Sequence, residues 1–145
     1  MILCDSNVWL ALALSGHVHH LPARAWLDAV DEPAAINFCR ATQQSFLRLL
    51  TSTAVFAPYG NRALTNMQAW AAYQALLGDE RIDFQEGEPP ELEPLWIKFA
   101  GRDSASPKMW MDAYLAAFAV GGGFTFVSTD RAFEQFAGLD LLILS

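Results

Sequence analysis

The chain has 145 residues, 53% of them hydrophobic, which supports one well-filled core and is too short for two ordinary domains. Residues 1–145 are therefore expected to form a single domain. No stretch approaches the roughly 20 uninterrupted apolar residues of a membrane span, and no basic leader precedes the first apolar run, so a cytoplasmic protein without membrane association is expected. The formal net charge of −7 argues against a broad basic surface for nucleic acid.

Short apolar runs alternate with helical patterns along the chain, which predicts an α/β fold with a parallel sheet covered by helices. In chain order, the predicted elements are a strand at 1–4, a helix to 14, a helix at 17–32, a strand at 34–39, helices at 42–50 and 64–77, a strand at 81–84, helices at 92–99 and 107–120, a strand at 124–127, a short helix from about 130 and a strand at 141–144. Cys4 and Cys39 fall in strand-like segments as small hydrophobic residues, so no disulfide is expected.

Local signals define several ends of these elements. Ser6 or Asn7 can cap the first helix, and Ser106 with Pro107 forms a cap and first-turn pair for the helix that ends before the glycines at 121–123. Acidic residues crowd the proline-containing segment 79–93, which is typical of a solvated connection. Outside that segment the charges nearly balance, so the net negative charge weighs less against an RNA-binding function.

Three aspartates stand out by their surroundings. Asp5 and Asp130 follow predicted strands, and open α/β sheets bind ligands at the carboxyl ends of their strands, although a residue of this kind taken alone is more often a helix cap. Asp112 is the only charged residue between 109 and 120, in an otherwise apolar helix. It therefore needs a partner, which is a cation, a salt bridge or the amino end of the helix.

Together, the three aspartates can converge at one edge of the sheet. At about 4 Å and an effective dielectric constant of about 20, each carboxylate pair repels by roughly 4 kcal/mol, and a divalent cation removes this repulsion. An all-oxygen carboxylate site suits Mg²⁺ or Mn²⁺, which can activate water against a phosphodiester.

Five segments that span nearly the whole chain resemble one known family. They are "MILCDSNVWLALAL", "GHVHHLPARAWLD", "FCRATQQSFLRLLT", "DAYLAAFA" and "FVSTDRAF". In this order the segments resemble the PIN domain, and specifically its VapC-like branch with a histidine-rich second helix. The resemblance implies a three-layer α/β/α fold with a central parallel sheet of four to five strands.

The resemblance also implies a function and assigns roles to residues. It implies a Mg²⁺-dependent endoribonuclease, with Mn²⁺ as a possible substitute, that acts as the toxin of a bacterial VapBC-type toxin–antitoxin system and cleaves RNA of the transfer or ribosomal class. Asp5, Asp112 and Asp130 match the catalytic metal ligands. The implied partners are the RNA substrate, a VapB-like antitoxin whose carboxy-terminal segment covers the acidic pocket, and a second copy of the chain in a homodimer.

The resemblance further implies three supporting polar residues, one of which departs from the family pattern. Asn7 and Thr129 match polar positions beside the pocket. Gln43 stands where many PIN domains have Glu, which leaves the site with one negative charge fewer and puts metal affinity in question. Two alternatives therefore stay open, namely a catalytically weakened PIN-fold binding module and a PIN nuclease of RNA processing without an antitoxin.

Other polar and aromatic groups have two interpretations each. The histidines at 17, 19 and 20 are either a transition-metal site or ordinary contacts at the start of a helix. Arg40 and Arg48 either contact phosphate or an antitoxin carboxylate, or are ordinary surface cations. The tryptophans at 9, 26, 70 and 96 are too many for one small core, which predicts that some of them line an interface.

Overall fold

The computed structural model describes residues 1–145 and contains one parallel sheet of five strands in the order β3-β2-β1-β4-β5. The strands are β1 (Ile2–Cys4), β2 (Ile36–Phe38), β3 (Ile82–Phe84), β4 (Thr125–Ser128) and β5 (Leu141–Ile143). All four strand pairs are parallel, and β1 lies at the centre between β2 and β4. The predicted central parallel sheet is confirmed.

Seven α-helices and two 3₁₀ turns connect the strands. They are α1 (Ser6–Ala13), α2 (His20–Asp28), α3 (Arg40–Leu50), α4 (Thr53–Phe56), η1 (Ala57–Tyr59), α5 (Asn66–Leu77), α6 (Leu92–Ala100), α7 (Met109–Gly122) and η2 (Arg131–Gln135). None of these helices has the length and apolar character needed to cross a membrane. Helix α3 begins two residues before the predicted start at Thr42, and the short helix α4 was not predicted.

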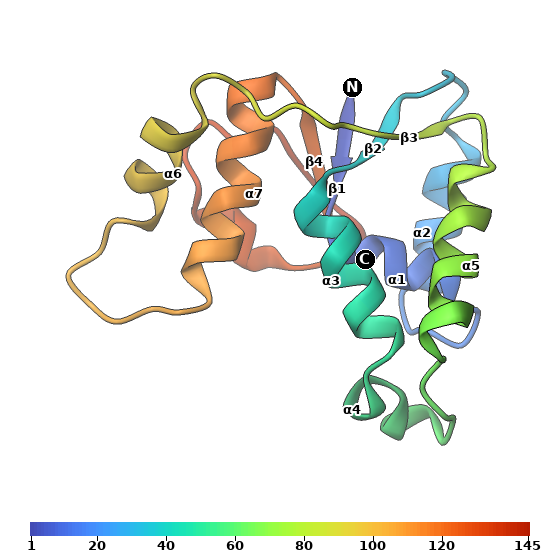
Figure 1. Cartoon of the computed structure of the whole chain (residues 1–145). Helices are drawn as coiled ribbons and strands as arrows, with labels where there is room; N and C mark the ends of the chain where they lie inside the picture. Colours follow the sequence, from blue (N-terminus) through green and yellow to red (C-terminus); the bar gives the residue numbers. More distant parts are fainter.

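The helices form layers on both faces of the sheet, with α6 and α7 on one side and α1, α2, α3 and α5 on the other (Figure 1). Successive residues of a strand point to opposite faces. Leu3 and Phe126 accordingly pack with α6 and α7, whereas Cys4 and Val127 pack with the other layer. The three-layer arrangement that the sequence predicted is therefore confirmed.

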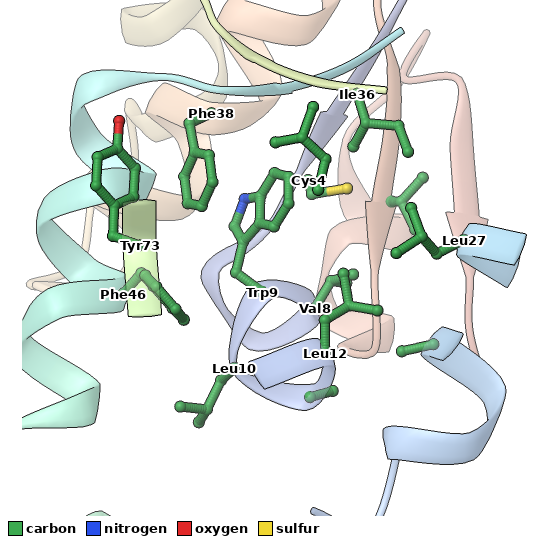
Figure 2. Packing of buried hydrophobic residues seen from close by; sticks show 14 of the residues in the cluster. Cys4, Val8, Trp9, Leu10, Leu12, Leu27, Ile36, Phe38, Phe46 and Tyr73 are labelled. Carbon is green, nitrogen blue, oxygen red and sulfur yellow. The ribbon is translucent and has the colours of Figure 1, made fainter. Parts of the chain in front are cut away.

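An aromatic stack holds helices α1, α3 and α5 together above the sheet. The Trp9 ring stacks on Phe38 with ring centroids 3.8 Å apart, and Phe38 also contacts Phe46 and the edge of Tyr73 (Figure 2). Trp9 is fully buried, so it is not one of the tryptophans that can line an interface, whereas Trp70 is exposed. Because Phe38 belongs to β2, the stack fixes α1 relative to the sheet and thereby fixes the residues at its amino end.

The predicted capping residues of α1 and α7 differ from those in the structure. Asp5, rather than Ser6 or Asn7, occupies the cap position of α1, and its side chain makes no capping hydrogen bond. Helix α7 starts at Met109 because the Ser106 carbonyl accepts a bond from the Met109 N–H and closes a turn before the helix. The carboxylate of Asp5 is consequently not used to cap α1 and is available for other contacts.

The acidic segment 79–93 is only partly a solvated connection. Its Asp79 carboxylate lies 2.8 Å from the Arg81 guanidinium, which also donates to the Leu27 carbonyl at 2.7 Å. Farther along, the Tyr114 hydroxyl donates to Glu88 at 2.6 Å and ties the segment to α7. Two of the surplus acids, Asp79 and Glu88, are therefore bound within the structure.

Candidate acidic site at the carboxyl edge of the sheet

The first and third of the predicted site residues follow neighbouring strands. Cys4 of β1 pairs with Val127 of β4, and the Asp5 N–H donates to the Val127 carbonyl at 2.9 Å. Asp5 and the residues that follow Val127 therefore leave the sheet at the same edge. This is the carboxyl edge, where ligand sites of open α/β sheets lie.

Asp5 is the most buried of the three aspartates, with only 6% of its surface exposed. Its Oδ2 accepts a hydrogen bond of 2.8 Å from the Ser128 hydroxyl, and its Oδ1 lies 3.5 Å from the Ser6 hydroxyl. The pKa of Asp5 is raised from 3.8 to about 6, chiefly by burial and in smaller part by the charges of Asp112 and Asp130, while the hydrogen bonds to Ser128 and Ser6 oppose the increase. The site thus destabilises the charged form of this carboxyl group.

Asp112 lies half-buried on the first turn of α7. Burial raises its pKa, the charge of Asp130 adds to the increase, and the nearby ammonium of Lys108 opposes it. The pKa of Asp5 in turn depends on Asp112 and Asp130. The structure therefore brings all three carboxylates within electrostatic range of one another, although they come from distant parts of the sequence.

Asp130 is exposed and has two local roles. Its Oδ1 accepts a bond of 2.9 Å from the Ala132 N–H, which caps η2, and its own N–H donates to the Ser128 hydroxyl at 2.9 Å. Ser128 thus links Asp5 and Asp130 through one buried hydroxyl. The sequence analysis missed Ser128, although a polar residue at the end of an apolar strand and two positions before Asp130 was a usable signal.

The three predicted supporting residues lie in different environments. Asn7 is exposed on the first turn of α1, and Thr129 is half-buried between Ser128 and Asp130. Gln43 is buried, its Oε1 accepts a bond of 2.6 Å from Arg40, and its side chain lies near the Tyr73 hydroxyl of α5. The hydrogen bond of the Gln43 side chain therefore goes to Arg40 and to none of the three aspartates.

A polar cavity of about 350 Å³ adjoins Asp5, and we call it the Arg48 cavity. Its lining residues are Ser6, Ser45, Arg48, Leu49 and Ser52. Ser6 both lines this cavity and lies beside the Asp5 carboxylate, so the cavity and the acidic site share a boundary. Helix α3 thus presents Ser45 and Arg48 here, rather than Gln43.

The three carboxylates are the candidate ligands for a divalent cation at this edge of the sheet. In the structure, no group of three or more His, Cys, Asp or Glu side chains is arranged so that it could hold a metal ion by itself. Mg²⁺ ordinarily retains several waters and binds through one or two carboxylates, so an open group of mutually repelling carboxylates fits its chemistry. The histidines make local contacts instead, in which His17 accepts from the His19 N–H and His20 lies 2.8 Å from the Ala11 carbonyl.

The sequence and the fold match a known family. A family model described as the PIN domain matches residues 2–139. The chain belongs to the PIN-domain family. Among curated relatives, Ribonuclease VapC41 of Mycobacterium tuberculosis is 59% identical to this PIN domain over 145 residues, covering 100% of this chain and 99% of the relative. The resemblance to the VapC-like branch, inferred above from five sequence segments, is confirmed.

Solved structures share the architecture of this PIN domain. Mycobacterium tuberculosis VapC20, a sarcin-ricin loop cleaving toxin, matches with a TM-score of 0.60 and 19% identity over 96% of this chain and 98% of that chain. VapBC2 from Rickettsia felis, bound to a DNA fragment from its promoter, matches with a TM-score of 0.63 and 11% identity over 100% of both chains. At these identities the likeness shows the fold alone.

Proposed function

We propose that this PIN domain is a Mg²⁺-dependent endoribonuclease and the toxin of a VapBC-type toxin–antitoxin system. The observation that carries the proposal is the group of three mutually repelling carboxylates, one of them buried, at the carboxyl edge of a PIN fold. The 59% identity with a protein named Ribonuclease VapC41 over the full chain supports the same activity.

In this proposal, Asp5, Asp112 and Asp130 hold Mg²⁺, and Mn²⁺ can replace it. When bound, such an ion neutralises negative charge on a phosphodiester and lowers the pKa of water. The residues of the chain provide the geometry. The Ser128 hydroxyl orients Asp5 and the backbone of Asp130, and Lys108 places a positive charge beside Asp112.

The proposed substrates are structured RNAs of the transfer or ribosomal class. VapC20, which shares the fold, is described as a sarcin-ricin loop cleaving toxin, and this supports the ribosomal alternative. The proposed partners are a VapB-like antitoxin and a second copy of the chain. An apolar groove of about 440 Å³ between α3 and α5, which includes the exposed Met67 and Trp70, is a surface suited to such contacts.

RNA cleavage tests the proposal directly. Purified protein is expected to cut bacterial transfer and ribosomal RNA with Mg²⁺ or Mn²⁺ and to lose this activity in a chelator. Asp5→Asn and Asp112→Asn should each reduce cleavage at least about 100-fold, since each removes a charge from the metal site. Cleavage products separated on denaturing gels give the readout.

Asp31→Asn is the matched control because Asp31 is an exposed carboxylate in the connection after α2. It should cut RNA as the wild type does. Circular dichroism should show that all variants remain folded. A folded wild type that cuts none of these RNAs with either ion would contradict the nuclease and favour the PIN-fold binding module.

A further inference from the structure

Most arginines of this acidic chain already have partners. Arg24, Arg81 and Arg131 form ion pairs with Asp28, Asp79 and Glu134. Arg40 donates to Gln43, and Arg102 donates to Gln135. Arg48 takes part in none of the three ion pairs, so its guanidinium charge is not neutralised by a carboxylate.

Arg48 lines the polar cavity beside the acidic site. The cavity brings together hydroxyls from three elements, with Ser6 at the start of α1, Ser45 on α3 and Ser52 at the cap position of α4. The Ser52 side chain makes no capping hydrogen bond, which leaves its hydroxyl available to a ligand. One arginine and three serines therefore line a space of about 350 Å³.

This set of groups suits a phosphate. Arginine binds phosphate through paired N–H donors, and serine hydroxyls are common donors to phosphate oxygens in protein–nucleic acid contacts. Since the chain carries only 9 Lys and Arg against 16 Asp and Glu, few places on it attract a polyanion. A cavity with an unneutralised guanidinium is one of those places.

We propose that the Arg48 cavity binds a backbone phosphate of the RNA strand next to the phosphate held at the acidic site. This inference rests on the proposed nuclease function and adds a substrate-positioning subsite to it. The shared boundary at Ser6, whose hydroxyl lies 3.5 Å from Asp5 Oδ1, makes the two places adjacent along one strand. Lys108 lies near Asp112, so a second positive charge accompanies the acidic site.

RNA binding tests the subsite without knowledge of the natural target, because phosphate contacts act on any sequence. The probe is a short fluorescein-labelled single-stranded RNA of mixed sequence, and anisotropy gives Kd at several salt concentrations in a chelator. Arg48→Ala should raise Kd roughly tenfold, because it removes one charged hydrogen-bonding contact with the RNA. It should also lower the slope of log Kd against log salt by about 1, whereas Arg48→Lys should retain most of that slope.

Arg62→Ala is the matched control, since Arg62 is an exposed arginine before α5 that also forms no ion pair. It should leave both Kd and slope near the wild-type values. In cleavage assays with Mg²⁺, Arg48→Ala should raise KM and leave kcat within about twofold, as expected for a uniform binding contact.

Two outcomes would overturn the subsite while the nuclease stands. One is a wild type that cleaves RNA and an Arg48→Ala variant whose Kd, salt slope and KM match those of Arg62→Ala. The other is an Arg48→Ala variant that keeps its RNA affinity and loses only affinity for a carboxylate-bearing antitoxin. A wild type that neither binds nor cleaves RNA would instead contradict the proposed function itself.

Discussion

At the scale of single residues, the burial of Asp5 sets the electrostatic character of the site. A carboxylate so near Asp112 and Asp130 is repelled by both and has little water around it, and one hydroxyl bond from Ser128 compensates only partly. Its pKa of about 6 therefore measures how poorly the protein alone stabilises the charged form. A bound cation supplies the missing stabilisation in the proposed function.

This elevated pKa predicts how stability depends on pH without metal. The folded state holds the Asp5 proton up to about pH 6, whereas the unfolded chain releases it near 3.8, so unfolding releases a proton within this window. The free energy of unfolding should consequently fall as pH rises from 4 to 7, with a contribution from Asp5 on the order of 3 kcal/mol. Urea unfolding at a series of pH values in a chelator measures this fall.

Asp5→Asn should flatten that dependence and should be more stable than the wild type at pH 7. Its amide oxygen can still accept the hydrogen bond from Ser128, so the substitution mainly removes the charge. A remaining slope of the same sign is expected from Asp112, whose pKa is also raised. If the free energy of unfolding of Asp5→Asn and of the wild type changed with pH in parallel, ionisation of Asp5 would not destabilise the folded state, which would contradict this prediction.

The sequence predicted individual residues unevenly, for physical reasons. Asp5 and Asp130 were recognisable because a carboxylate directly after an apolar strand has a fixed place in a parallel sheet. Ser128 was missed because its importance depends on a hydrogen bond across 123 positions of sequence. Gln43 was placed beside the acids by resemblance, but whether a side chain on that turn of α3 points toward Asp5 or toward Tyr73 depends on tertiary packing.

At the scale of elements, the sequence predicted which segments form strands and helices better than where they begin. All five strands lie within or close to the predicted ranges, because runs of apolar β-forming residues are strong signals. The start of α7 was wrong because Ser106 and Pro107 form a turn through backbone hydrogen bonds instead of capping the helix. Helix α4, with four residues, is too short to show a periodic pattern.

Helix α5 provides a test of local stabilisation away from the site. The Thr65 hydroxyl accepts from the Gln68 N–H at 3.1 Å, and the Gln68 amide oxygen accepts from the Thr65 N–H at 3.0 Å, forming a capping box. Thr65→Ala should therefore lower the free energy of unfolding by about 1 kcal/mol. Thr65→Ser keeps the hydroxyl and should cost much less, and equal losses in both would rule out the cap as the cause.

At the scale of the whole molecule, the order of the strands turns separate sequence signals into one site. Placing β1 beside β4 brings residues 5 and 128–130 together, and the helix that precedes β4 supplies Asp112 from the neighbouring layer. Alternating elements predicted a parallel sheet, but not the side-by-side position of β1 and β4, which depends on long-range packing. The periodicity of the sequence did not predict that the three aspartates share one site. The resemblance to the PIN domain did.

The placement of charged groups over the whole chain bears on how it can bind RNA. The chain is acidic overall, yet two acids of segment 79–93 are bound to Arg81 and Tyr114, and the unneutralised Arg48 lines a cavity that shares Ser6 with the acidic site. An acidic protein can therefore bind RNA through a few well-placed groups, without the broad basic surface that the composition excluded. Binding of this kind should be weak in affinity and sensitive to salt.

The central claim is that Asp5, Asp112 and Asp130 together trap a dication, and calorimetric titration with Mn²⁺ tests it most directly. Wild type and Asp31→Asn should bind Mn²⁺ with the same affinity and release protons at pH 6, because the ion displaces the Asp5 proton. Asp112→Asn and Asp5→Asn should each lose most of the affinity for Mn²⁺. Asp5→Asn should also release fewer protons on binding than the wild type. Equal Mn²⁺ affinity in all four proteins, or none in the wild type, would contradict the account.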